Sequence, residues 1–266
     1  MTARGKRGFD ARVAHPARVY DYWLGGKDNF EADRIAGEAT IAAYPQIRSS
    51  ARANRAFLAR TVRYLATDQG VRQFLDIGTG LPTANNTHEV AQAVAPASRI
   101  VYVDNDPLVL SHARALLTSS PEGVTAYLDA DLRDTDHILE LAADTLDFTQ
   151  PVAIMLLAIL HYIPDLDEAQ RIVARLVGAV PSGSYVTISH AASDIAPEEM
   201  AEMIRRMNEH LAEGNHVGRP RDVVARFFDG LDRVEPGVVK VTEWRPASEL
   251  EARAATSLWG GVGRKP

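Results

Sequence analysis

The sequence predicts a Rossmann-like α/β fold, with a mostly parallel sheet and helices on both of its faces. Three observations predict it. Short β-rich runs alternate with helical patterns through the middle of the 266-residue chain, which is the rhythm of βαβ units. The run PVAIMLLAIL at 151–160 is apolar throughout, as expected for a strand buried on both faces. A glycine loop follows the first strand, in FLDIGTG at 74–80.

The elements of this core are predicted from their residue patterns. Runs rich in Val, Ile, Leu and Tyr predict strands at 73–77, 99–104, 124–129, 152–158 and 184–190. Apolar residues at helical spacing predict helices at 86–95, 107–117, 135–142 and 167–179. The pairs Asp106–Pro107 and Asp165–Asp167 are typical of helix N-termini and predict where two of these helices begin. Further along, 231–244 and 257–266 read as two closing strands.

Helical segments precede and interrupt this core. Residues 1–16 lack apolar periodicity and are interpreted as a flexible tail. Residues 17–70 predict an N-terminal helical lid, whose helical pattern breaks near Tyr44-Pro45. The core then occupies 71–266, with a helical insertion at about 194–220. A methionine stripe in that insertion, Met200, Met203 and Met207, is interpreted as core packing or as a cap over a ligand pocket.

Composition narrows the partners and the compartment. A net charge of −6 argues against nucleic acid as an obligatory partner, because such proteins need a concentrated basic surface. The absence of cysteine excludes disulfides, thiolate zinc sites and cysteine nucleophiles. The histidines show no metal-binding spacing, so we expect no metal. No signal-peptide core or membrane-length apolar run is present, and we expect a cytoplasmic protein without a membrane partner.

The loop FLDIGTGLPTANN at 74–86 favours a nucleoside that carries an ammonium group. Gly78 and Gly80 allow the backbone to approach a ligand closely. The loop lacks the terminal Lys and Ser or Thr of a P-loop, and Thr83 stands where a dinucleotide loop has its third glycine. Asp76 would repel a pyrophosphate, and its carboxylate can accept hydrogen bonds from an ammonium group of a ligand or from backbone amides of its own loop. The loop therefore favours S-adenosylmethionine over NAD.

Acidic residues also end the next two strands. Asp104, followed by Asn105, can accept hydrogen bonds from two vicinal ribose hydroxyls, and Asp106 is better placed than Asp104 to cap the next helix. Asp131 can accept a hydrogen bond from an adenine amino group, and Asp129 is an alternative for that role. Acids at the tips of three consecutive strands predict one nucleoside site, because parallel strands end at the same edge of a sheet.

With these motifs in place, the sequence resembles class I S-adenosylmethionine-dependent methyltransferases. The runs YDYWLGGKDNF at 20–30 and FLDIGTGLPT at 74–83 resemble a subfamily of largely unassigned substrate. The resemblance covers about residues 15–266. It implies a seven-stranded sheet whose last strand is antiparallel. It also implies that Asp76, Gly78 and Gly80 flank the methionine part of the cofactor, that Asp104 binds the ribose, and that Asp131 with Leu132 binds the adenine.

Two sets of residues are candidates for activating or enclosing the methyl acceptor. His161 follows the fourth strand and is either a general base or a histidine that caps the strand; His190 is a weaker second candidate. Tyr20, Tyr22, Trp23 and Phe30 predict an aromatic lid, with Tyr22 assigned to the cofactor, although packing of a helix on the sheet is the alternative. The paired glycines Gly25 and Gly26 favour a loop that faces the ligand.

The sequence therefore predicts a methyltransferase that acts on an oxygen or nitrogen nucleophile of a small molecule. Residues 17–50 and 191–220 are expected to build the pocket for that acceptor. A protein that binds S-adenosylmethionine or a nucleoside as a sensor or regulator, without transferase activity, is the alternative. An NAD(P)-dependent oxidoreductase is a third hypothesis, weakened by the lack of a Tyr-x-x-x-Lys pair near the fifth strand.

Overall fold

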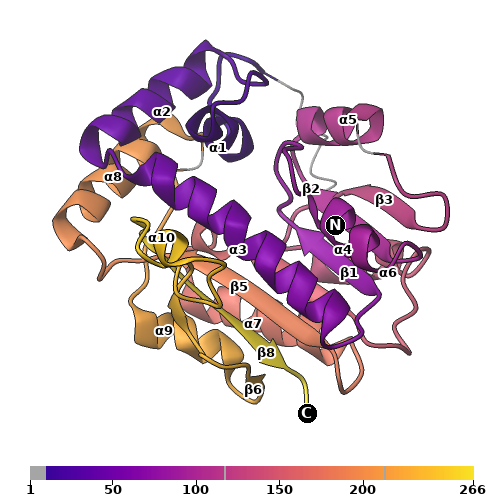
Figure 1. Cartoon of the computed structure of the whole chain (residues 1–266). Coiled ribbons are helices and arrows are strands. Elements are labelled where there is room, and N and C mark those ends of the chain that lie inside the picture. The colour runs from indigo at the N-terminus through magenta and orange to yellow at the C-terminus, as the bar shows by residue number, and fades with distance from the viewer. Residues whose placement is uncertain (1–9, 117, 213) are drawn as a thin grey trace.

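A mostly parallel eight-stranded sheet forms the centre of the computed structural model, which describes residues 10–116, 118–212 and 214–266 (Figure 1). The strand order is β3-β2-β1-β4-β5-β8-β6, and β7 also pairs with β8. Strands β1 to β5 are parallel, whereas β8 runs antiparallel to β5. The strands are β1 Gln73–Ile77, β2 Arg99–Asp104, β3 Val124–Asp129, β4 Ala153–Leu157, β5 Tyr185–Ala191, β6 Asp232–Arg233, β7 Val239–Lys240 and β8 Leu258–Arg264.

The fold class is confirmed, and one detail of it is corrected. Seven strands were expected, but the segment before β8 forms two strands of two residues each, β6 and β7. Both pair antiparallel with β8. A turn separates them, in which Gly237 has a φ of +83° that favours glycine. The turn is closed by a hydrogen bond from the Gly237 N–H to the carbonyl of Val234, and it divides the expected strand in two.

Helices flank the sheet and extend beyond one of its edges. Their bounds agree closely with the helices predicted for the core, and Asp165 caps α7 by accepting a hydrogen bond from the Glu168 N–H. The α-helices are α1 Pro16–Leu24, α2 Glu31–Ala43, α3 Ile47–Thr67, α4 Thr87–Val94, α5 Pro107–Leu116, α6 Thr135–Ala142, α7 Leu166–Gly178, α8 Pro197–His210, α9 Arg221–Ala225 and α10 Glu249–Ala252; two 3₁₀ turns are η1 Leu160–Tyr162 and η2 Arg226–Phe228.

Two apolar cores lie on opposite faces of the sheet. Alternate residues of a strand point to opposite faces, and along β4 Met155 joins the first core while Ile154 joins the second. The first core also contains side chains of α3 and α4, and the second contains side chains of α6 and α7. Figure 1 shows α3 running across one face of the sheet. This three-layer packing leaves the ends of the parallel strands free to form a site.

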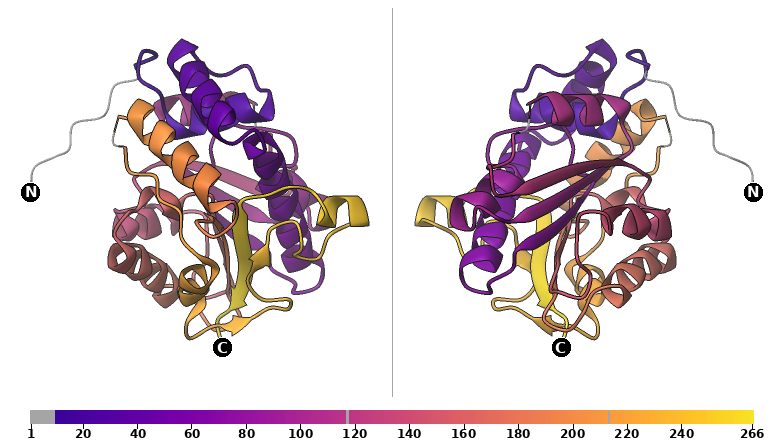
Figure 2. Two further views of the ribbon diagram at one scale, coloured as in Figure 1. Left: turned by 90° about the vertical axis from the view of Figure 1, so that its left-hand side faces the viewer. Right: turned by 90° about the vertical axis from the view of Figure 1, so that its right-hand side faces the viewer.

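The N-terminal helices and α8 gather at one end of the molecule (Figure 2). Residues 1–9 of the expected tail lie outside the described residues, but residues 10–16 are part of the fold. Ala14 is buried and forms a β-bridge with Leu211, just after α8. The expectation of a flexible tail is therefore wrong for residues 10–16, because main-chain pairing and burial hold them in place.

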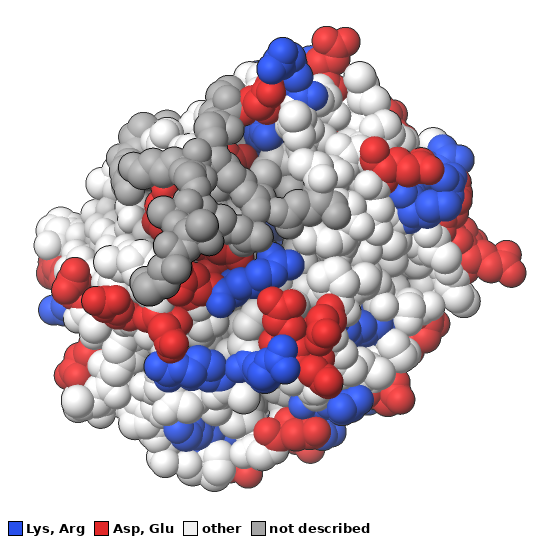
Figure 3. Space-filling model, turned by 180° about the vertical axis from the view of Figure 1, so that it is seen from behind, with Lys and Arg blue, Asp and Glu red and all other residues white. Residues whose placement is uncertain are grey.

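The surface carries a mixture of charges. On the face shown in Figure 3, Lys and Arg side chains are interspersed with Asp and Glu. Among the described residues, no helix has both the length and the apolar character needed to cross a bilayer.

Candidate cofactor and acceptor site

A cavity of about 190 Å³, here called the main cavity, lies at the carboxyl ends of β1 to β4. It is bordered by every cofactor-binding residue predicted from the sequence except Tyr22. Those bordering residues are Asp76, Gly78, Gly80, Asp104, Asn105, Asp131 and Leu132. The parallel register of β1, β2 and β3 brings the ends of these strands together, as expected for consecutive parallel strands.

The glycine loop adopts a backbone that only glycine accommodates easily. Gly78 has φ +75° and Gly80 has φ +67°, both in the left-handed region. A Cβ atom at Gly78 would also lie 2.6 Å from Cγ1 of Ile159. The Gly78 N–H donates to the carbonyl of Val103, which ties the loop to β2. The loop therefore turns sharply at the floor of the main cavity.

The position of Thr83 is explained by where the next helix begins. Helix α4 starts at Thr87, so residue 83 lies in the loop and not at a helix–strand contact. The Thr83 N–H donates to Asn86 Oδ1, and the Asn86 N–H donates to Glu89 Oε2. These hydrogen bonds give partners to backbone N–H groups of the loop and of the residue before α4. They do not require the close helix–strand packing that a third glycine allows.

Asp76 is buried at the end of β1, where its carboxylate accepts a hydrogen bond from the next helix. Thr87 Oγ1 donates to Asp76 Oδ2 at 2.6 Å. Burial raises the pKa of Asp76 to about 6; the Thr87 hydrogen bond and the charge of Arg55 oppose this shift, and nearby Asp104 adds to it. A buried carboxylate with a raised pKa favours a cationic ligand, because the positive charge compensates for the lost hydration. The ammonium group expected from the sequence would be such a ligand.

Asp104 is held rigidly at the end of β2. Its Oδ2 accepts a hydrogen bond from the Gly80 N–H at 2.9 Å, and its Oδ1 accepts one from the Asp106 N–H at 3.0 Å. Burial raises the pKa of Asp104, and the two backbone hydrogen bonds oppose that shift. Each oxygen keeps a second lone pair. The carboxylate can therefore support the glycine loop and still accept two hydroxyl hydrogen bonds.

Asp131 and Leu132 border the main cavity beyond the end of β3. Asp131 Oδ1 accepts a hydrogen bond from the Arg133 N–H at 2.9 Å. Leu132 is buried beside it and offers an apolar surface. Asp129, the alternative to Asp131, is exposed and does not border the cavity. An acid next to an apolar side chain suits a flat heterocycle with an exocyclic amino group.

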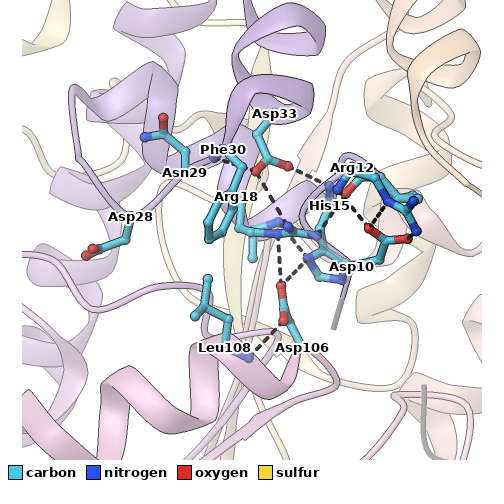
Figure 4. A network of polar contacts seen from close by, with 12 residues as sticks. Asp10, Arg12, His15, Arg18, Asp28, Asn29, Phe30, Asp33, Asp106 and Leu108 are labelled. Carbon is cyan, nitrogen blue, oxygen red and sulfur yellow. Dashed lines mark hydrogen bonds and ion pairs between the residues drawn. The ribbon is translucent and has the colours of Figure 1, made fainter. Parts of the chain in front are cut away.

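A buried polar network fixes the N-terminal segment over the main cavity (Figure 4). Arg18 of α1 lies between two carboxylates, with its Nε 3.3 Å from Asp106 Oδ2 and its Nη1 3.6 Å from Asp33 Oδ2. His15 Nδ1 lies 3.1 Å from the same oxygen of Asp106. The His15 N–H donates to Asp33 Oδ1 at 2.9 Å. The network joins α1 and α2 to the loop after β2, two residues from Asp104.

The aromatic lid is only partly as predicted. Tyr22 does not border the main cavity; it packs on Gly37 of α2, and its hydroxyl donates to Glu38. Tyr20 borders the cavity instead, and its hydroxyl donates to the carbonyl of Ala51. Gly25 ends α1 with φ +84° and does not border the cavity either. Tyr20, and not Tyr22, is therefore the tyrosine of α1 that borders the main cavity.

A second, smaller cavity of about 30 Å³ adjoins the main cavity and is here called the side cavity. Tyr20, Ala158 and Tyr162 border both cavities. Helices α1, α3 and α8 and the ends of β4 and β5 enclose it. Its lining is Tyr20, Trp23, Ile47, Ser50, Ala51, Ala158, His161, Tyr162, Ala191, Met200, Met203, His216, Ser257 and Leu258.

His161, the predicted candidate base, borders the side cavity and not the main cavity. Burial lowers its pKa well below the usual value, and the neighbouring His216, His190 and Arg219 lower it further. Its Nδ1 accepts a hydrogen bond from the Ala191 N–H at 3.4 Å. A neutral ring that accepts at Nδ1 carries its proton on Nε2. In this state His161 is a hydrogen-bond donor toward its surroundings.

His190, the weaker candidate, is held inside the protein. Its Nε2 lies 2.8 Å from Arg219 Nη1, and its Nδ1 lies 2.8 Å from the carbonyl oxygen of Ala191. Burial lowers its pKa to about 3. His190 therefore orients Arg219 and borders neither cavity. Among the described residues, no group of three or more His, Cys, Asp or Glu has the geometry of a metal site.

Sequence reasoning missed several residues of the main cavity. Asn54 and Arg55 of α3 border it, and Arg55 Nη2 donates to the carbonyls of Ala84 and Asn85 in the glycine loop. The Asn54 amide donates to the Tyr20 hydroxyl at 3.1 Å. The available signal was Asn54, a polar residue on the buried face of α3 that also carries Ala53 and Phe57. Arg133 and His15 also border the cavity, from loops whose path no local pattern predicts.

Fold and cavity together define an α/β protein with a ligand cavity at the carboxyl ends of its parallel strands, which is where such folds bind nucleotides and nucleosides. The comparison with protein families identifies it further. Residues 2–266 match the model of the S-adenosyl methyltransferase family, and the chain belongs to that family. Its cofactor is S-adenosylmethionine, and its reaction is methyl transfer. Among the three sequence hypotheses, the family membership supports the methyltransferase.

Solved structures agree with this assignment. A DUF574 family protein from Streptomyces avermitilis is 45% identical over 97% of this chain and 99% of that chain, with a TM-score of 0.92. A putative methyltransferase from Thermobifida fusca is 39% identical over 99% of both chains, with a TM-score of 0.89. An O-methyltransferase family protein from Burkholderia thailandensis, 16% identical with a TM-score of 0.52, shares the fold; the match covers 84% of this chain and 61% of that chain. No curated protein matches the chain significantly.

Proposed function

We propose that the main cavity binds S-adenosylmethionine and that the methyl acceptor is a small molecule with an oxygen or nitrogen nucleophile. The observation that carries the second part is the side cavity, which adjoins the main cavity and is enclosed by helices α1, α3 and α8. A cavity of about 30 Å³ enclosed by three helices admits only a small group, which supports a small-molecule acceptor.

The residues of the main cavity fit the three parts of the cofactor. Asp76, with its raised pKa, binds the ammonium group of the methionine part, and the left-handed turn at Gly78 and Gly80 lets the backbone approach the same part. Asp104 accepts hydrogen bonds from the ribose hydroxyls. Asp131 binds the adenine amino group, with Leu132 against the ring and Asn105 beside the ribose.

The chemistry is a displacement at carbon. When bound, S-adenosylmethionine supplies a methyl group on a positively charged sulfur. The acceptor atom forms a bond to the methyl carbon while the carbon–sulfur bond breaks and its electron pair stays on sulfur; the proton of the acceptor leaves to a base or to water. The protein aligns the two reactants and excludes water, which accounts for much of the rate in such reactions.

The prediction that the acceptor is a small molecule is tested by following a labelled methyl group. The protein is incubated with methyl-labelled S-adenosylmethionine and a cell extract, and the products are separated by mass. We expect the label to move to the low-mass fraction. Label that accumulates in the protein or nucleic-acid fraction would contradict a small-molecule acceptor.

The substitution Asp104→Ala is expected to weaken the binding of S-adenosylmethionine and S-adenosylhomocysteine by at least about tenfold, measured by calorimetry, because a charged hydrogen-bond acceptor is lost. Asp129→Ala is the matched control, since Asp129 pairs with Asp104 in the sheet register but is exposed and outside the cavity. A denaturation curve for each variant separates loss of binding from loss of fold. Unchanged affinity in folded Asp104→Ala would mean that the ribose is held elsewhere.

A further inference from the structure

The lining of the side cavity contains no charged side chain among the described residues. No Asp, Glu, Lys or Arg borders it, whereas Asp76, Asp104, Asp131, Arg55 and Arg133 all border the main cavity. A charged group that entered the side cavity would lose its hydration without gaining an ionic partner, which is unfavourable. The cavity therefore selects uncharged ligands.

Aromatic rings and thioethers make up much of this lining. Tyr20, Trp23 and Tyr162 contribute rings, and Met200 and Met203 reach in from α8. Such groups favour flat aromatic ligands through ring–ring and sulfur–ring contacts. A ring fits a cavity of about 30 Å³ only after side chains of the lining move, and the unbranched methionine side chains have the most rotamers with which to do so.

One residue of the lining, His216, has a buried polar atom without a partner. Nδ1 of His216 is inaccessible to solvent and has no hydrogen bond in the described structure. Its residue is 4% exposed, and burial lowers the pKa of the imidazole to about 4, so the ring is neutral near pH 7. The Asn208 side chain holds the main chain of His216 through two hydrogen bonds, of 2.8 and 2.9 Å. Buried polar atoms normally have partners, so a ligand group is a natural one here.

The boundary between the two cavities is built with a strained residue. Ala158, directly after β4, has φ +53°, which is unfavourable for a residue with a Cβ. Its N–H donates to the carbonyl oxygen of Ser189 and to Ser189 Oγ, which fixes this conformation. Ser189 Oγ in turn donates to Asn54 Oδ1 at 2.6 Å. Backbone strain of this kind is concentrated where a ligand must be positioned.

We propose that the side cavity is the acceptor subsite and that it takes an uncharged aromatic molecule with a hydroxyl group, whose O–H donates to His216 Nδ1. This inference rests on the proposed function, because the acceptor must reach a methyl group held in the main cavity. Tyr20, Ala158 and Tyr162 then form the passage at which the hydroxyl oxygen meets that methyl group.

The first experiment compares neutral and anionic acceptors that share the same ring. The probes are phenol and 2-naphthol, each paired with its carboxylated counterpart, 4-hydroxybenzoate and 6-hydroxy-2-naphthoate. Transfer from methyl-labelled S-adenosylmethionine is measured while cofactor binding is followed by calorimetry on the same sample. We expect transfer to the neutral phenols and at least about tenfold less to the carboxylates. Equal transfer to both, or no transfer to neutral phenols by protein that binds the cofactor, would overturn the inference; failure to bind the cofactor would instead contradict the proposed function.

The second experiment uses variants of the lining. His216→Leu is expected to raise KM for the phenol about tenfold with unchanged cofactor affinity, and His216→Asn, which keeps a polar atom near the Nδ1 position, is expected to recover part of this loss. Met203→Ala is expected to favour 2-naphthol over phenol, whereas Met207→Ala, buried in the same helix but outside the cavity, should leave their ratio unchanged. Identical KM values for His216→Leu and the unchanged protein would refute the role of His216.

Discussion

Replacement of Arg18 by methionine is expected to lower the free energy of unfolding by about 3–5 kcal/mol. Arg18 is 4% exposed and lies between Asp33 and Asp106, which are 0% and 3% exposed. The methionine fills a similar volume but leaves two buried carboxylates without their cation. Urea denaturation measures the change as a lower midpoint.

Arg12→Met is the control for this experiment. Arg12 belongs to the same segment and pairs with Asp10, but its side chain is 89% exposed. Exposed ion pairs contribute little, so the denaturation midpoint should not move. If Arg18→Met unfolds at the same urea concentration as Arg12→Met, the network of Figure 4 does not hold the N-terminal segment in place.

Replacement of Asp76 by asparagine is expected to stabilise the protein and to weaken cofactor binding. The pKa of Asp76 is raised from 3.8 to about 6 in the folded protein, so its contribution to stability is fully present below pH 3.8 and is lost as the pH rises through about 6. The cost of the ionised form at pH 8 is on the order of 3 kcal/mol. The asparagine side chain lacks that cost and still accepts the hydrogen bond from Thr87, but it cannot pair with an ammonium group.

Two measurements check this prediction. Denaturation at pH 8 and at pH 5 should show that Asp76→Asn is more stable than the unchanged protein at pH 8, with a smaller difference at pH 5. Calorimetry should show at least about tenfold weaker binding of S-adenosylmethionine. Asp129→Asn, at an exposed strand end, should change neither quantity. A destabilised Asp76→Asn that binds the cofactor normally would contradict both the charge and the role assigned to Asp76.

The parts of the site that follow from topology could be predicted from the sequence. Asp76, Asp104 and Asp131 end or follow three consecutive strands, and parallel strands bring such ends to one edge of the sheet. Strand and helix patterns are local, so their bounds were also accessible. No contact between distant residues was needed for either inference.

What depends on packing between helices could not be predicted. Tyr22 turns toward α2 because Gly37 leaves room for its ring, where a Cβ would lie 2.4 Å from Tyr22 Cδ1. Residues 10–16 are ordered because Asp33 and Leu211, far along the chain, bind them. Neither partner is visible in the local sequence. The side cavity belongs to the same class, because its lining comes from separate regions of the chain.

The position of β8 inside the sheet has a consequence for how the protein folds. This strand lies between β5 and β6, and its first residue, Leu258, borders the side cavity with Ser257, whose N–H donates to Ser50 Oγ. Contacts between residues about two hundred positions apart close late, since the entropy of a long loop must be overcome first. The lining of the side cavity is therefore complete only once β8 has paired with β5, because Ser257 and Leu258 form part of it.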